Sequence, residues 1–316
     1  MPDFSVVLNG VLTLIILLVP GFLFEKTRFV PEGFTKGLTN LTLYVAQPFM
    51  IMNSFLRTFD ANILADIGFE ILLGLIGYSV AFAVICLFFR KMPGDKKGVL
   101  RFMMLFTNAG FMGLPILQSI FPENADLVVM YATGVIVCHN VLTWTLGVRV
   151  LAPSEKGKGI KSLLNPGVIG CTTGILLFAV SAASFLPQFV LNVSDQLAGL
   201  ATPLAMYIVG ANLAHFDFKS LARTPQLILA ALMRLFVLPA IIFGVFYVIK
   251  LTGILPLTSL LVAVPFLQFC MPSASVTTMM SVRFGGDPVF ASAGVSLTTV
   301  LSLLSIPVMS LMLSFL

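Results

Sequence analysis

Two apolar segments interrupted by proline are the part of this sequence best suited to bind a ligand. The first, residues 107–115, has an asparagine and two glycines before Pro115, and the second, residues 265–275, contains Pro272. Proline donates no backbone N–H and frees the carbonyl group four residues earlier. Hydrocarbon does not tolerate freed groups unless protein or a water-filled cavity receives them. Because both segments lie in runs long enough to cross a bilayer, we expect them to meet at a polar cavity.

A helix that restarts after a break presents a new amino terminus, and such a terminus attracts anions. Its free N–H groups carry roughly +0.5 of an elementary charge. Asn108 can donate or accept a hydrogen bond, and Gly110 and Gly113 let the backbone approach a ligand. The second segment contributes Pro272, Ser273 and Ser275. The chemistry that these residues predict is the binding of a carboxylate.

Few ionisable side chains lie deep in the apolar runs, and each supports two interpretations. Arg234 lies about nine residues, or roughly 14 Å, into its run, where it either supports a ligand site or forms a structural pair. His139 could couple transport to protons or simply accept a hydrogen bond. Glu70, near the end of its run, is either a proton or cation site or an interfacial acid.

Two further residues are candidates from their positions alone. Gln268 lies one turn before Pro272, so it could support the second break. Trp144 is the one tryptophan, and it either anchors the chain at the membrane interface or contacts a ligand with its ring.

The composition is that of an all-α integral membrane protein. The 316 residues are 58% hydrophobic and 10% charged, whereas soluble domains average about 25% charged residues. Apolar runs long enough to span a bilayer recur along nearly the whole chain. We expect ten membrane-spanning helices, at about 5–24, 36–56, 67–89, 99–121, 125–149, 163–185, 192–214, 225–249, 257–281 and 288–315.

The basic residues are arranged for a membrane and not for nucleic acid. The loops that follow the odd-numbered helices hold 15 of the 18 Lys and Arg residues, and the other loops hold two. By the positive-inside rule the basic loops are cytoplasmic. We therefore predict a multi-pass protein of the plasma (inner) membrane with both termini outside, on the periplasmic side in a bacterium.

The two halves of the chain share the positions of several prolines. Pro48 corresponds to Pro203 and Pro115 to Pro272, with nearly constant offsets of about 155 and 157 residues. We predict two repeats, residues 1–150 and 162–316, joined by a cytoplasmic linker at 151–161. An odd number of helices per repeat inverts the second copy in the membrane. Inverted repeats with broken helices 4 and 9 crossing near the midplane are an architecture of secondary transporters.

These motifs together resemble the auxin efflux carrier family, which includes the plant PIN-type carriers. The Asn108-to-Pro115 stretch is similar to the Asn-x5-Gly-x-Pro type of motif in that family's fourth helix. The other matching stretches are Arg234-x4-Pro239, Met271-Pro272, Arg283-Phe284, Asp287-Pro288 and Ser305-Ile306-Pro307. The short central linker resembles that of bacterial members, which are associated with malate, malonate and similar carboxylates.

The resemblance implies a mechanism as well as a fold. Helices 1, 2, 6 and 7 would form a scaffold, often dimeric, and helices 3–5 and 8–10 a moving transport unit. It implies elevator-type alternating access for an organic anion that contacts Asn108 and the backbone at Pro115 and Pro272. His139 and Trp144 fall where PIN-type carriers have a glutamine and a tyrosine lining the site.

Other classes of function fit the sequence less well. A sodium- or proton-coupled symporter of the bile-acid symporter or antiporter type is the main alternative, but no Asp or Glu lies beside either break. The four cysteines have no metal-ligand spacing, so we expect no metal and no cofactor. The sequence has neither H-E-x-x-H nor G-x-S-x-G, so we expect no enzyme activity. The expected partners are a small organic anion, the lipid bilayer and, as an open alternative, a second copy of the chain.

Overall fold

The computed structural model describes residues 4–88, 96–151, 166–215 and 224–316. These residues are helical apart from turns, short connections and one isolated β-bridge. Six helical stretches are long and apolar enough to cross a membrane: Ser5–Lys26, Ala61–Phe88, Pro122–Leu151, Gln188–Ala214, Pro225–Thr252 and Pro288–Phe315. Three shorter apolar stretches are Ala109–Ile120, Pro166–Ala179 and Ser259–Cys270. The all-helical membrane fold expected from the hydropathy is confirmed. The predicted linker at 151–161 lies, apart from its first residue, outside the described residues.

Several of the expected membrane helices consist of two consecutive pieces. In the first half the α-helices are α1 (Phe4–Lys26), α2 (Phe34–Leu41), α3 (Gln47–Ser54), α4 (Ala61–Phe88), α5 (Lys96–Leu105), α6 (Leu114–Ile120), α7 (Ala125–Leu142) and α8 (Val148–Leu151). In the second half they are α9 (Pro166–Ala179), α10 (Gln188–Gly199), α11 (Ala201–Ala214), α13 (Pro225–Leu232), α14 (Leu238–Thr252), α15 (Ser259–Cys270), α16 (Val276–Arg283) and α17 (Pro288–Ser310). Wider π-helical turns join some of these pieces, at Thr42–Ala46, Ala109–Gly113, Thr143–Gly147 and Met233–Val237.

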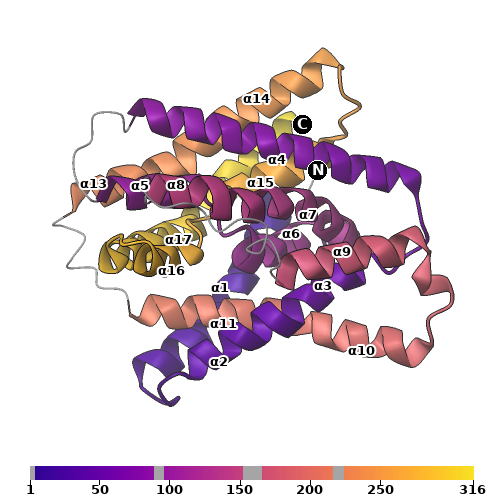
Figure 1. Cartoon of the computed structure of the whole chain (residues 1–316), viewed down its shortest axis with the longest axis horizontal. Coiled ribbons are helices and arrows are strands. Elements are labelled where there is room, and N and C mark those ends of the chain that lie inside the picture. The colour runs from indigo at the N-terminus through magenta and orange to yellow at the C-terminus, as the bar shows by residue number, and fades with distance from the viewer. Residues whose placement is uncertain (1–3, 89–95, 152–165, 216–223) are drawn as a thin grey trace.

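The helices form two groups that lie side by side (Figure 1). We call α1, α2, α3, α9, α10 and α11 the scaffold group, because α1 packs along α11 and α3 packs against α9 and α10. The remaining helices, α4–α8 and α13–α17, form the crossing group, in which α4 packs on α7, α14 on α15 and α16 on α17. The division into a scaffold and a transport unit that the family resemblance implies stays a prediction.

Glycines bring the two central scaffold helices into close contact. A Cβ atom added at Gly21 of α1 would meet the carbonyl oxygen of Tyr207 on α11, and one at Gly210 of α11 would meet the carbonyl oxygen of Leu18 on α1. Small residues at such a crossing let two helix backbones approach within a membrane. The helices α1 and α11 are therefore tightly packed against each other.

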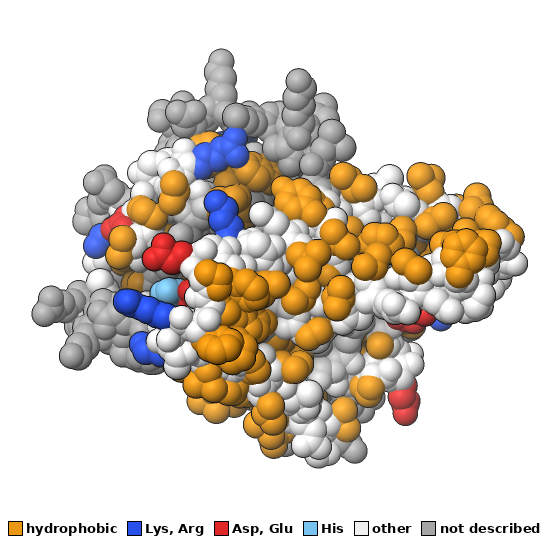
Figure 2. Space-filling view, turned by 90° about the horizontal axis from the view of Figure 1, so that it is seen from below, with side chains coloured by type: hydrophobic (Ala, Val, Ile, Leu, Met, Phe, Trp, Pro, Cys, Tyr) orange, Lys and Arg blue, Asp and Glu red, His pale blue; other side chains and the backbone are white. Residues whose placement is uncertain are grey.

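The outer surface suits contact with lipid. Figure 2 shows apolar side chains over a broad face, with Lys and Arg gathered towards one end of that view. The large apolar side chains that are exposed on the surface include Ile16 and Leu23 of α1, Phe189 and Val193 of α10, and Leu304 of α17. In Figure 1 the α3–α4, α9–α10 and α14–α15 connections emerge at the end of the molecule opposite the start of α5 and the end of α11. The helices thus run back and forth between two ends.

Candidate ligand-binding site at two crossed helix breaks

The two interrupted helices are joined at their breaks by a short antiparallel bridge between Thr107 and Ser273. Its hydrogen bonds run from the Asn108 N–H to the Pro272 carbonyl (2.8 Å) and from the Ala274 N–H to the Phe106 carbonyl (2.9 Å). Backbone groups that have left a helix within a membrane must find such partners. Backbone groups of the two breaks therefore serve as each other's hydrogen-bond partners.

The first break begins at Phe106, nine residues before Pro115, and not at the proline. The helix α5 ends at Leu105, and the chain is extended through the bridge before a π-helical turn, Ala109–Gly113, leads into α6. In this turn the Gly113 N–H bonds to the Asn108 carbonyl at 3.0 Å. Pro115 lies inside the continuous helical stretch Ala109–Ile120, directly after the π-helical turn. The break therefore lies at the start of the predicted segment 107–115 and not at Pro115 itself.

The second break lies where the sequence predicts it. The helix α15 ends at Cys270, Met271 has extended backbone angles, and α16 begins at Val276. After Pro272, the Ser273 N–H donates to the hydroxyl of Thr298 on α17 at 3.2 Å. The hydroxyl of Ser273 itself is fully buried and has no hydrogen-bond partner among the described residues.

A buried arginine binds the carboxyl end of the α15 half-helix. Arg234 is 1% exposed, and its Nη2 donates to the Met271 carbonyl oxygen at 2.9 Å. Its Nε has no partner, and no carboxylate from the described residues lies within ion-pair distance of its guanidinium. The crossing therefore carries a positive charge that these residues do not neutralise.

A small cavity lies beside the crossing, between the two helix groups. Its volume is about 20 Å³, which is room for roughly one water molecule. Asn108 and Ser275, the residues that precede the two restarted helices, both line it. The other lining residues are Val209, Asn212, Leu213, Val295, Ser296 and Thr299. The cavity in this conformation is therefore smaller than a carboxylic acid.

Three of these polar lining residues were missed by sequence reasoning. Asn212 comes from α11, and Ser296 and Thr299 come from α17. Ser296 and Thr299 are three residues apart in an apolar helix, a spacing that places two side chains on one face. That spacing was the available signal, whereas the position of α11 against the breaks has no signature in the sequence.

The two predicted glycines face different partners. A Cβ atom added at Gly110 would lie 2.5 Å from Nε2 of Gln47 in the scaffold group. One added at Gly113 would lie 3.5 Å from Cγ of Met271 in the second break. Gly110 therefore permits close contact between the helix groups, whereas at Gly113 an added Cβ would make only an ordinary van der Waals contact with the second break.

His139 lies next to the crossing, whereas Trp144 does not contact it. The His139 Nδ1 is 2.9 Å from the hydroxyl of Tyr78, and its ring packs edge-on against Phe106 at 5.6 Å. The Trp144 ring instead receives the guanidinium of Arg283, 5.5 Å from its centroid at the end of α16. The structure thus brings only one of these two predicted residues to the breaks.

The side chains of Glu70 and Gln268 are fully buried. Neither carboxylate oxygen of Glu70 has a hydrogen-bond partner among the described residues, and Gly134 packs against its Cβ. Gln268 donates to the Ala132 carbonyl at 3.3 Å and leaves its Oε1 without a partner. Neither residue lines the cavity. Within the described residues, no group of three or more His, Cys, Asp and Glu side chains could hold a metal ion.

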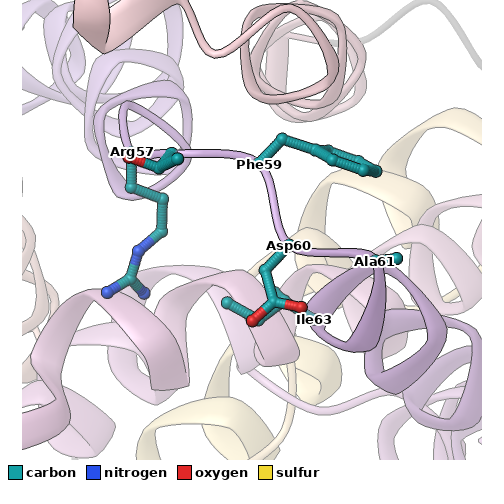
Figure 3. Close-up of a pocket in the computed structure, with 6 residues that line it drawn as sticks. Arg57, Phe59, Asp60, Ala61 and Ile63 are labelled. Carbon is teal, nitrogen blue, oxygen red and sulfur yellow. The ribbon is translucent and has the colours of Figure 1, made fainter.

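A second, more open cavity lies away from the breaks, at the loop between α3 and α4 (Figure 3). It has a volume of about 620 Å³ and is lined by Arg57, Thr58, Phe59, Asp60, Ala61 and Ile63. Arg57 reaches across to α7, where its Nη1 lies 3.8 Å from the sulfur of Met130. It shares no lining residue with the cavity at the crossing.

Apolar spans, backbone breaks joined within the helix bundle and a polar cavity between two helix groups define a multi-pass membrane transporter. Comparison with known sequences agrees, because the model of the membrane transport protein family matches residues 6–160 and 158–310. The chain belongs to this family, that of the auxin efflux carriers.

Two archaeal proteins are similar to the chain over nearly its whole length. An uncharacterized transporter of Methanocaldococcus jannaschii is 25% identical over 95% of this chain and 96% of its own length. An uncharacterized transporter of Methanothermobacter thermautotrophicus is 24% identical over 96% of this chain and 97% of its own length.

Proposed function

We propose that the protein carries small organic anions, such as malate, malonate or auxin-like acids, across the plasma membrane by elevator-type alternating access. One observation carries this proposal: the residues that precede both restarted helices, Asn108 and Ser275, line one cavity. The positive ends of two helix dipoles therefore point towards the same place. A carboxylate bound there would be held without a lysine in the lipid.

The charge of the crossing supports an anion over a neutral or cationic substrate. Arg234 adds a full positive charge on the second break, and no carboxylate of the described residues pairs with it. A buried charge without a partner is costly, and an anionic ligand would reduce that cost. A cationic substrate would increase it.

The division of the cavity between two helix groups supports the elevator mechanism. Asn212 and its neighbours come from the scaffold group, whereas Asn108, Ser275 and Thr299 come from the crossing group. A ligand at such a boundary would become accessible to either side when one group slides along the other. Because Gly110 has no side chain, the backbone of the moving group could pass close to Gln47 of the scaffold group.

In this proposal the predicted residues have graded roles. Asn108, Ser275 and the backbone at Pro272 contact the anion, with Gly110, Gly113 and Ser273 shaping the site. His139 is separated from the site by Phe106, against which its ring packs. Gln268 and Arg234 support the second break, and Glu70 is a site for a coupling proton. We place both termini outside, from the distribution of Lys and Arg.

Uptake of radiolabelled malate and malonate into proteoliposomes tests this proposal. We expect saturable uptake that is accelerated by unlabelled substrate inside the vesicles, which separates a carrier from a channel. Asn108→Ala should abolish specific uptake, whereas Asn192→Ala, on the exposed surface of α10, should leave it unchanged. Normal uptake by folded Asn108→Ala protein would contradict the proposed site.

A further inference from the structure

Arg234 occupies a position that suits a cation. The half-helix α15 ends at Cys270, so its last carbonyl groups and the negative end of its dipole point towards the break. In secondary transporters with broken helices, such carboxyl ends and unwound carbonyls coordinate the coupling sodium ion or proton. Here the Met271 carbonyl, the first beyond the end of the helix, accepts a hydrogen bond from the Arg234 guanidinium instead.

The surroundings of Met271 fit a guanidinium better than a sodium ion. A sodium site usually adds carboxylate oxygens to the carbonyl groups, but α15 and α16 contain no Asp or Glu. The cationic side chain at this place is covalently attached, 1% exposed and held by a π-helical turn, Met233–Val237, between α13 and α14. It therefore cannot dissociate during a transport cycle.

We propose that Arg234 is a built-in replacement for a coupling sodium ion, so that the carrier moves its anion without sodium. This inference rests on the proposed function and specifies the coupling of the same site. Because Arg234 and Met271 both belong to the crossing group, the fixed charge travels with the bound anion. The positive charge that a symporter collects from solution in each cycle is permanently present here.

A side chain that only fills space would give a different response from a cation that holds the break. Removing the guanidinium with Arg234→Ala leaves the Met271 carbonyl without its donor and opens a space in which a small soluble cation fits. A soluble guanidinium ion can then restore the missing charge and hydrogen bond. It cannot restore the packing of the aliphatic part of the side chain.

The experiment compares the parent protein, Arg234→Ala, Arg234→Lys and Arg234→Gln, with Arg149→Ala on the exposed side of α8 as the matched control. Malonate uptake and the melting temperature of purified protein are measured in sodium chloride, in choline chloride, and in choline chloride with millimolar methylguanidinium. We expect the parent and Arg149→Ala to give the same values in all three. Arg234→Ala should lose roughly 10-fold to 100-fold in uptake rate, the effect of one charge-assisted hydrogen bond.

Methylguanidinium or sodium should raise both the uptake and the melting temperature of Arg234→Ala, and should affect neither in the parent. Arg234→Lys should keep more uptake than Arg234→Gln, which also tests the inference if the alanine variant does not fold. A sodium requirement in the parent, or parental uptake by Arg234→Gln, would overturn it. If the parent takes up no carboxylate at all, the proposed function fails, and the cation response of the melting temperature still decides the role of Arg234.

Discussion

The two helix breaks meet in one bridge, but different parts of the molecule hold them. The first break faces the scaffold group, through Gly110 against Gln47 and through Asn108 in the shared cavity. The second break is fixed within the crossing group, where Arg234 binds the Met271 carbonyl and the Thr298 hydroxyl accepts from Ser273. Both breaks thus reach the shared cavity, through Asn108 and Ser275, but the second break is in addition held by side chains of its own group.

The same contrast extends to the helices beside the breaks. With the predicted repeat offset of 157 residues, Arg234 corresponds to Gly77 on α4. A Cβ atom at Gly77 would meet the ring of Phe269, so this position has no room for a charged side chain. If the predicted repeat holds, the charge of Arg234 on one side of the crossing has no counterpart at Gly77 on the other.

A substitution at Gly77 that removes this difference should have the largest effect on stability. Gly77→Arg would place a second cation in a space filled by the Phe269 ring, and would cost stability both from the clash and from a buried unpaired charge. We expect no folded protein in detergent by size-exclusion chromatography. Gly68→Arg, on the same helix where a Cβ atom meets nothing within 4 Å, is the control and should fold.

A smaller loss of stability is expected where the scaffold helices touch. Gly210→Ala would push a Cβ atom into the Leu18 carbonyl, a backbone atom that cannot move away easily. We expect a cost of about 1–3 kcal/mol and a clearly lower melting temperature. Gly199→Ala, in α10 with open space around it, should melt at the parental temperature or slightly above. Equal melting of the two variants would contradict the packing described for α1 and α11.

The contact between the first break and the scaffold should affect transport more than stability. Gly110→Ala would place its Cβ against the end of the flexible Gln47 side chain, which can shift. We expect slower uptake with a nearly unchanged melting temperature. Because Gln47→Ala removes the obstructing atoms, the double variant should recover uptake. No recovery would mean that Gly110 acts through backbone conformation and not through this contact.

The smallest effect is expected at Pro115. Pro115 lies after the break, inside the helical stretch Ala109–Ile120, and the bridge at Thr107 holds the break without it. Pro115→Ala should therefore reduce uptake less than Pro272→Ala, because Pro272 lies within the second break itself. Initial uptake rates of the two variants, normalised to folded protein, decide this order. The reverse order would show that the π-helical turn before Pro115 maintains the break.

The sequence predicts the class and the general place of the site well, and its local geometry less well. Hydropathy predicts the apolar helices, and Pro272 predicts the second break, because proline has a fixed local effect. The position of the first break could not be predicted, because a π-helical turn absorbs the distortion near Pro115. The placement of Asn212 in the cavity and of Trp144 beside Arg283 depends on packing between distant segments. No local sequence pattern predicts such contacts.

The central claim is that the anion binds in the cavity between Asn108 and Ser275, and protection of an introduced cysteine tests it most directly. Ser275→Cys is prepared with Cys86→Ala, which removes the one native cysteine that is not buried, and is labelled with a small charged thiol reagent in proteoliposomes. Ser314→Cys, in the exposed C-terminal segment, is the control. We predict that malonate or malate slows labelling at position 275 and leaves position 314 unaffected. Equal labelling at position 275 with and without carboxylates that the parent protein transports would contradict the proposed site.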